Sequence, residues 1–165
     1  MPMKVLVTGA GGFVGDALCR RLFASGCRVT GIFRDQPSPR EWMETRVAGD
    51  LTQLSDFKDV VQRADAVIHL AARVHMMRDT AADPASAFRQ ANADVTKRLA
   101  QAAADAGAGR FVFLSSVKVN GEETAATPFS EKDMPAPGDA YGRSKRDAED
   151  ALQKIAATTK MAVTT

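Results

Sequence analysis

Short runs of apolar and β-branched side chains recur along the chain, and longer stretches of helical periodicity separate them. Several of the runs are almost continuously apolar, which is typical of strands covered on both faces. Strands that alternate with helices in this way predict βαβ units and a doubly wound parallel sheet, an α/β fold. The predicted strands span residues 4–8, 28–33, 46–48, 66–70, 110–115 and 161–165.

Two of the intervening stretches show clear helical periodicity. In residues 13–23 the apolar positions are spaced by three and four, and Gly26 is placed to end that helix. The longest helix begins near Pro84 and carries apolar residues on one face as far as Ala106. Asn92 lies on this face, where a buried amide needs a hydrogen-bond partner.

Two parts of the chain depart from this regular alternation. Residues 117–140 contain three prolines, two glycines and five acidic residues without periodicity, which predicts a long loop with a functional role. The last predicted strand ends at the final residue, with no helix after it to cover its edge. We therefore expect residues 1–165 to form one domain that is truncated after the sixth strand.

Composition narrows the functional classes. The chain has 165 residues, of which 45% are hydrophobic and 25% charged, as in one ordinary globular domain. Its net charge of +2 is too small to indicate binding to nucleic acid or to a membrane surface. Apolar stretches such as residues 66–72 are far shorter than the roughly 20 residues of a membrane-spanning helix. Because no signal-type leader precedes the first strand, we expect a soluble protein of the cytoplasm.

Cysteine and histidine are too few to build a disulfide framework or a metal site. Cys19 and Cys27 are predicted to be small buried thiols. His69 and His75 have no ligand-type partners at the spacings of zinc sites, so no metal is expected.

The segment between the first strand and the first helix is rich in glycine, since residues 8–15 are Thr-Gly-Ala-Gly-Gly-Phe-Val-Gly. Glycines there allow a tight turn, a close approach of a pyrophosphate to the backbone, and close packing of helix on strand. The helix N-terminus adds a positive field. Taken alone, the motif also fits a glycine-rich turn without a ligand. The predicted dinucleotide contacts are Gly9, Gly12, Phe13, Val14 and Gly15.

A second motif, with Tyr141 and Lys145 four residues apart, lies at the start of a predicted helix. Four residues make about one helical turn, so the phenol and the ammonium share a face, where the cation prepares the phenol to exchange a proton. This spacing alone is common on helix surfaces, but with the glycine motif it resembles the extended short-chain dehydrogenase/reductase family. The resemblance implies a Rossmann-type fold that binds NAD(P), with Tyr141 as the acid/base and Lys145 holding the ribose.

A third segment, residues 111–121, ends a predicted strand in a pair of hydroxyls. Ligands bind beyond the carboxyl ends of the strands in such sheets. The segment is similar to the Ser-Ser-x-x-Val-Tyr-Gly stretch of UDP-sugar epimerases, which implies that Ser116 is catalytic and orients the substrate. Lys118 and Asn120 depart from that pattern, and Ser115 is assigned to hydrogen bonding at the strand end.

Further segments match the family in order along the chain. Asp50 and Leu51 follow the third strand, where the family has an adenine-binding Asp, although a turn or N-cap role explains Asp50 equally well. His69 begins a segment that matches the chain beside the cofactor, and it is itself predicted to pack in the core with its hydrogen bonds satisfied. The cofactor contacts that these matches imply are Asp50, Leu51, Leu70, Ala71, Ala72 and Asn92, in addition to Tyr141 and Lys145.

The end of the second strand bears on the phosphate state of the cofactor. NAD-binding sites place an Asp or Glu there, which binds the ribose 2′-hydroxyl. Here Phe33 takes that position, Arg34 follows and is suited to a 2′-phosphate, and Asp35 comes one or two residues late. The sequence therefore favours NADP slightly over NAD, with Arg34 as the phosphate-binding residue.

The resemblance also implies a reaction, namely hydride transfer at C4 of a nucleotide sugar. The enzyme is then a UDP-glucose 4-epimerase-like protein or a 4-reductase of bacterial polysaccharide synthesis, with a homodimer as the family expectation. A non-catalytic NAD(P)-binding regulator of the same fold is the alternative, and Tyr141 with Lys145 argues against it. The sugar pocket is expected to lie largely in residues after the sixth strand.

Overall fold

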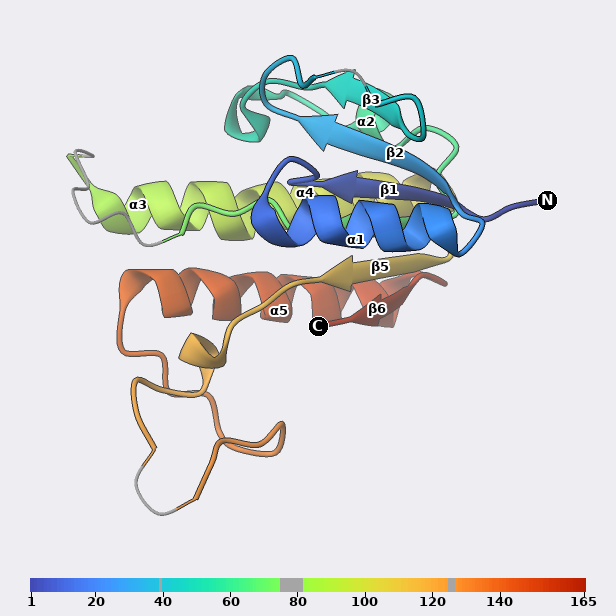
Figure 1. Ribbon diagram of the computed structural model, residues 1–165. Coiled ribbons are helices and arrows are strands. Elements are labelled where there is room, and N and C mark those ends of the chain that lie inside the picture. Colours follow the sequence, from blue (N-terminus) through green and yellow to red (C-terminus); the bar gives the residue numbers. More distant parts are fainter. Residues whose placement is uncertain (39, 75–81, 125–126) are drawn as a thin grey trace.

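The computed structural model describes residues 1–38, 40–74, 82–124 and 127–165. At its centre is a parallel sheet with the strand order β3-β2-β1-β4-β5-β6 (Figure 1). This order is that of a Rossmann-type fold, and the prediction of a parallel α/β sheet is confirmed. The strands are β1 (Lys4–Thr8), β2 (Arg28–Phe33), β3 (Glu44–Val47), β4 (Ala66–His69), β5 (Arg110–Phe113) and β6 (Ala162–Thr164).

Helices cover both faces of the sheet because its strands carry apolar side chains alternately above and below. On one face Val5 and Val7 pack under α1, which lies in front of the sheet in Figure 1. On the other face Leu6, Val67 and Phe111 form a core with the helices that follow β3, β4 and β5. The helices are α1 (Phe13–Ala24), α2 (Lys58–Val61), α3 (Pro84–Phe88), α4 (Val95–Asp105) and α5 (Ala140–Thr158), with shorter turns η1 (Leu51–Gln53), η2 (Arg89–Asp94) and η3 (Val117–Val119).

Element boundaries differ from expectation in places where the side chains are partly exposed. β3 begins at Glu44, because this edge strand carries polar residues that give no apolar run. The long helix runs from α3 to α4 through η2, a π-helical segment that widens the helix without changing its apolar spacing. Ala106 was expected to pack on the sheet. Instead it follows the last turn of α4 and is exposed.

The cysteines are free thiols, as predicted, but only Cys19 is fully buried and Cys27 is half-buried. Burial raises the pKa of the Cys19 thiol to about 11, which makes it unreactive near neutral pH. The described residues contain no group of three or more His, Cys, Asp or Glu side chains able to hold a metal, and His75 lies outside them. Within the described part of the chain, every helix is too short or too polar to cross a membrane.

Candidate functional site

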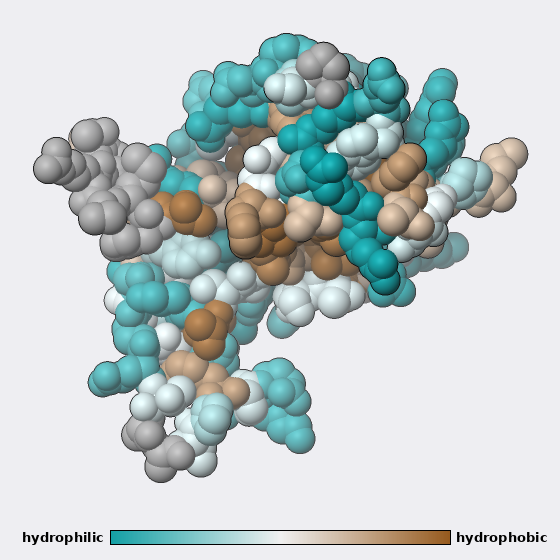
Figure 2. Space-filling model, viewed as in Figure 1, coloured by the Kyte–Doolittle hydropathy of each residue, from teal (hydrophilic) through white to brown (hydrophobic). Residues whose placement is uncertain are grey.

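The segments that the sequence singled out meet at one edge of the sheet. Parallel strands have their carboxyl ends on the same side, and ligands bind there in open α/β sheets. The glycine turn follows β1, Arg34 follows β2 and Asp50 follows β3. Residues 70–72 follow β4, and Ser116 lies beyond β5. The surface around the amino end of α1 at this edge is apolar (Figure 2), and Phe13 is almost completely exposed there.

The glycine turn packs so closely that side chains would not fit at two of its positions. Gly9 has a φ of +69°, and a Cβ on it would lie 2.8 Å from the backbone nitrogen of Ala71. A Cβ on Gly15 would lie 2.1 Å from the carbonyl oxygen of Gly9, so only glycine fits at both positions. Gly12 is the N-cap of α1, and no side chain caps the first-turn N–H groups. Uncapped amides at the positive end of a helix are groups that bind phosphate.

A buried hydrogen bond joins β1 to β4 beneath this turn. Thr8 Oγ1 lies 2.6 Å from His69 Nδ1, and the N–H of Ala71 donates to the same hydroxyl oxygen at 3.3 Å. Burial lowers the pKa of His69 to about 3, so the imidazole is neutral and unsuited to act as a base. The structure thus places His69 in the core as predicted, but its Nε2 has no hydrogen-bond partner among the described residues. The half-buried side chains after β4 along this edge are Leu70, Ala71 and Ala72.

Asp50 caps the short η1 turn. Its carboxylate accepts hydrogen bonds from the backbone N–H of Thr52 at 2.9 Å and from the Thr52 hydroxyl at 2.8 Å. These two hydrogen bonds hold the pKa of Asp50 below its usual value, and the charge of Arg34 lowers it further. The N-cap alternative is therefore the role that the structure shows, and contact of Asp50 and Leu51 with adenine stays a prediction.

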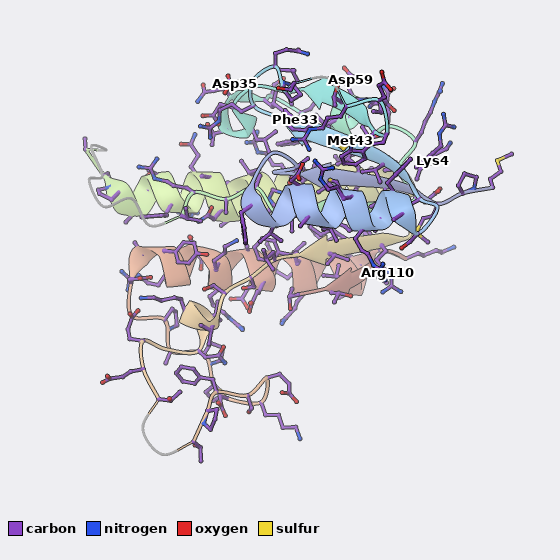
Figure 3. All side chains as sticks on the ribbon, in the orientation of Figure 1. Lys4, Phe33, Asp35, Met43, Asp59 and Arg110 are labelled. Carbon is purple, nitrogen blue, oxygen red and sulfur yellow. The ribbon has the colours of Figure 1, made fainter. Side chains whose placement is uncertain are left out.

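Phe33 closes the end of β2 against the glycine turn. A Cβ on Gly11 would lie 3.2 Å from the Phe33 ring, so this ring packs against the glycine turn. Arg34 and Asp35 follow and are exposed, and Figure 3 shows Asp35 beyond the end of β2. Arg34, the cation that the sequence analysis assigned to the phosphate, thus lies at this edge of the sheet.

Arg40 is a second cation beside the turn, and the sequence analysis missed it. Its guanidinium lies 5.5 Å from the centre of the Phe33 ring and forms an ion pair with Asp16 in the first turn of α1. It also lies 6.0 Å from the Trp42 ring. The only signal in the sequence is a second arginine in the loop that contains Arg34, and spacing alone cannot show that this loop folds back over Phe33.

The structure brings Tyr141 and Lys145 together on α5. The Lys145 ammonium lies 5.9 Å from the centre of the Tyr141 ring and 4.5 Å from that of Phe113. It donates a hydrogen bond to the carbonyl oxygen of Leu114 at 2.8 Å. Lys145 is only 3% exposed, and this burial lowers its pKa to about 8, while the charge of Glu149 partly opposes the shift. A lysine of this kind is still protonated at neutral pH, so a buried cation stands next to the phenol.

Asn92 ties the segment after β4 to the first turn of α5. Its side-chain N–H groups donate to the carbonyl oxygen of Arg73 and to the Ser144 hydroxyl, both at 2.9 Å. Its side-chain oxygen accepts from the N–H of Arg73 at 2.8 Å. Ser144 in turn donates to the carbonyl oxygen of Tyr141 at 2.7 Å. The predicted partners of this buried amide are therefore present, and they support the backbone that carries Tyr141.

The two serines beyond β5 have different partners. Ser116 is the N-cap of η3 and accepts a hydrogen bond from the N–H of Lys118 at 3.2 Å. Ser115 lies two residues after the end of β5 and donates to the Glu149 carboxylate of α5 at 2.5 Å, a structural hydrogen bond in line with its assignment.

Lys118 connects the long loop to the start of α5. Its ammonium pairs with Glu122 and, at 3.1 Å, with Asp139, the N-cap of α5. Asp139 accepts from the N–H of Gly142 at 2.6 Å, which lowers the pKa of this carboxyl. A Cβ on Gly142 would lie 2.6 Å from the Lys118 carbonyl oxygen, so the two segments touch. The sequence marked Lys118 only as a departure from the family pattern, whereas the structure shows it holding the turn that bears Tyr141.

The strand order and the tightly packed glycine turn before α1 define a Rossmann-type dinucleotide-binding domain. The chain belongs to the NAD dependent epimerase/dehydratase family, whose model matches residues 5–165. This confirms the resemblance to extended short-chain dehydrogenases.

Relatives and solved structures point the same way. A UDP-glucose 4-epimerase of Vibrio cholerae is 39% identical over 165 residues, which make up 99% of this chain and 50% of that protein. The structure of MoeE5 in complex with UDP-glucuronic acid and NAD matches with a TM-score of 0.81 and 34% identity, over 97% of this chain and 52% of that one. UDP-glucuronic acid 4-epimerase from Bacillus cereus in complex with NAD matches with a TM-score of 0.80 and 27% identity, over 98% and 55%. The chain thus spans about half the length of these proteins.

Proposed function

We propose that this chain is the cofactor-binding part of an enzyme that transfers hydride at C4 of a nucleotide sugar, in the manner of a UDP-glucose 4-epimerase. The observation that carries the proposal is the buried Lys145 ammonium beside the Tyr141 ring, at the sheet edge that also holds the glycine turn. A regulator that only senses the cofactor has no need of this pair. The relative from Vibrio cholerae, a 4-epimerase, favours epimerisation over net reduction.

The residues present fit a dinucleotide. The uncapped amides at the amino end of α1 would hold the pyrophosphate, and the absence of side chains at Gly9 and Gly15 lets the turn pack closely enough to present them. Small side chains at Ala71 and Ala72 let the backbone after β4 approach the cofactor. Lys145 is placed to hold the ribose on the nicotinamide side. A bound nicotinamide would supply reversible hydride transfer at this site.

The protein's own groups handle the proton. Tyr141 exchanges a proton with the sugar hydroxyl as general acid/base, and Ser116 orients that hydroxyl. The Lys145 cation stabilises the negative charge that develops on the phenol oxygen, and its effect is strong because the site around it is buried. The Leu114 carbonyl and the Phe113 ring fix the ammonium in this position.

We further propose that the cofactor is NADP rather than NAD. No acidic side chain stands at the position of Phe33, and two arginines lie beside it, since Arg34 follows it in the chain and Arg40 lies over its ring. Guanidinium groups bind phosphate through paired charge-assisted hydrogen bonds. The neighbouring structures contain NAD. The proposal of NADP for this chain therefore rests on Arg34 and Arg40.

The reaction is tested by product analysis with UDP-glucose, on the chain and on a protein extended by about 100 to 150 residues, another domain's length. A 4-epimerase forms the C4 epimer with no net change in nicotinamide absorbance, whereas a 4-reductase consumes reduced cofactor in proportion to product. We expect the epimer from the extended protein alone. We attribute the remote binding energy that positions the sugar to the part of the relatives that this chain does not match. Cofactor binding without turnover of any UDP-sugar by the extended protein would refute the proposal and favour a regulator.

A further inference from the structure

A cavity of about 370 Å³ lies at the opposite edge of the sheet, at the amino ends of the strands. It is bordered by the starts of β1 and β2, by the residues that lead into β3, and by the turn after α2. Its volume is within the range of small-molecule sites, about 300 to 1,000 Å³. Because the strands are parallel, this cavity and the glycine turn are separated by the length of the sheet.

The lining of this cavity carries an excess of positive charge. Cations outnumber acids by four to two, which leaves a net charge of +2. Glu44 accepts hydrogen bonds from Arg46 at 2.8 Å and from Thr30 at 3.2 Å, so its negative charge is already engaged within the lining. The cations are Lys4, Arg28, Arg46 and Arg63, and the acids are Glu41 and Glu44.

Two of these cations are direct neighbours in the sheet. Lys4 and Arg28 are register partners on β1 and β2, so their side chains leave the sheet on the same face. Like charges opposite each other on adjacent strands destabilise a sheet. The charge of Arg28 acts on the Glu44 carboxylate and helps to lower its pKa, which offsets part of this repulsion, and a bound anion would offset more of it. Figure 3 places Lys4 at the amino end of β1, and Arg110 at the amino end of β5 on the same edge.

Arg63 stands in a backbone conformation that favours glycine. Its φ is +62°, in a tight turn that the N–H of Ala64 closes on the carbonyl oxygen of Val61 at 3.2 Å. Glycine adopts this conformation in a turn without strain, whereas a residue with a side chain is strained there. Strained positions of this kind are retained at ligand sites more than elsewhere. The strain here puts a guanidinium on the rim of the basic cavity.

We propose that this cavity is a second binding site, for a small phosphate-bearing molecule, with Lys4, Arg28 and Arg63 as the phosphate-binding residues. Guanidinium forks match phosphate oxygens geometrically, and several cations around a small volume favour a multiply charged phosphate over a single carboxylate. The site is independent of the proposed reaction, because Lys4, Arg28 and Arg63 lie at the amino ends of the strands and in the turn after α2, away from the cofactor edge.

The test is a titration of the ¹⁵N-labelled chain with inorganic pyrophosphate, followed by amide chemical shifts. Residue-resolved shifts separate this cavity from the glycine turn, which can bind the same ion. We expect saturable shifts at Lys4, Arg28 and Arg63, and at least about fivefold weaker binding at these amides in Arg28→Gln. Arg110→Gln, which removes a cation from the same edge but outside the cavity, leaves the affinity unchanged.

Arg63→Gly separates binding from folding. The substitution removes one cation and relieves the positive φ, so we expect a higher melting temperature together with weaker pyrophosphate binding. A gain in melting temperature with unchanged binding would overturn the assignment of Arg63. Absence of saturable shifts at the cavity, or equal losses in Arg28→Gln and Arg110→Gln, would overturn the site. Equal binding of sulfate at the same ionic strength would show only unspecific anion attraction and would also contradict the proposal.

Discussion

Lys145 is a buried cation that the fold holds next to Tyr141, the proposed acid/base. Its ammonium is buried, donates to the Leu114 carbonyl oxygen and lies over the Phe113 ring. Burying a cation costs free energy, and the pKa of about 8 measures that cost against the usual 10.5. This cost falls next to Tyr141, where the proposed proton transfer would gain from a fixed positive charge.

The lowered pKa of Lys145 predicts a pH dependence of stability. Above about pH 8 the folded protein releases this proton, while the unfolded chain keeps it up to about pH 10.5, so the unfolded state binds more protons. The contribution of Lys145 to the free energy of unfolding therefore rises between pH 8 and 10.5, by at most on the order of 3 kcal/mol. Denaturant unfolding of wild type and Lys145→Met across this range measures it. Lys154→Met, at an exposed lysine of the same helix, is the control, and parallel curves for wild type and Lys145→Met would contradict the expectation.

Tyr141→Phe removes one oxygen atom and little volume. In the extended protein we expect turnover to fall by about 10²- to 10⁴-fold, with cofactor binding preserved, because the phenol acts on the proton alone. Lys145→Met is expected to weaken both turnover and cofactor binding. Steady-state rates and fluorescence titration with reduced cofactor distinguish the two variants. Wild-type turnover in Tyr141→Phe would mean that another group is the acid/base.

Arg34→Ala tests the choice of cofactor. A charge-assisted contact with phosphate contributes about 1.5 to 3 kcal/mol, so the affinity for NADP should fall roughly tenfold or more, while that for NAD changes little. Arg40→Ala is also expected to lower the affinity for NADP more than that for NAD, because we assign both arginines to the phosphate. Arg21→Ala, an exposed arginine at the end of α1, serves as the control. Equal losses for NAD and NADP would show that Arg34 does not recognise the 2′-phosphate.

At the residue scale, spacing along the chain predicted the contacts that depend on one element or on one short turn. Tyr141 and Lys145 lie four residues apart on one helix, so their proximity follows from helix geometry. Arg40 and Lys118 could not be assigned in this way, because their contacts depend on the paths of two loops. Such paths are set by tertiary packing, as where Arg40 lies over the Phe33 ring.

At the scale of elements, the start of α5 is the critical junction. Asp139 caps the helix two residues before Tyr141, and Lys118 holds this carboxylate from the other side. The Gly142 position fits against the Lys118 backbone only because glycine has no Cβ. The orientation of the phenol is therefore determined by the loop that precedes the helix as well as by the helix itself.

Asp139→Ala tests this junction. Loss of an N-cap costs about 1 kcal/mol, so the midpoint of denaturant unfolding should fall. Asp139→Asn keeps an oxygen that accepts from Gly142 but loses the ion pair with Lys118, so we expect a smaller loss of stability. Identical midpoints for Asp139→Ala and wild type would show that the cap contributes nothing.

Strands that are buried on both faces were the easiest elements to predict. β1 and β2 have the predicted bounds. A short, nearly continuous apolar run is typical of a strand that is covered on both faces. The π-helical η2 was missed, since a widened turn depends on local packing and leaves no mark in the apolar spacing. That segment carries Asn92, in line with the frequent occurrence of π-helical turns at functional sites.

At the scale of the whole molecule, the parallel sheet separates two kinds of surface. The carboxyl edge gathers the glycine turn, Asp50, Ser116 and Tyr141, while the amino edge holds the basic cavity around Arg28. The chain covers about half the length of its relatives, and the groups proposed to contact the cofactor all lie within it. Cofactor binding is thus the activity that this chain itself is expected to show.

The most direct measurement is a fluorescence titration of the 165-residue chain with NADPH and NADH, alongside Gly15→Ala and Gly109→Ala. A Cβ on Gly15 would meet the Gly9 carbonyl oxygen at 2.1 Å, whereas a Cβ on Gly109 meets its nearest neighbour at an ordinary 3.8 Å. We predict saturable binding to wild type and Gly109→Ala, tighter for NADPH, and none to Gly15→Ala. Failure of the folded wild-type chain to bind either cofactor, or equal binding by Gly15→Ala, would contradict the assignment of this edge as a dinucleotide site.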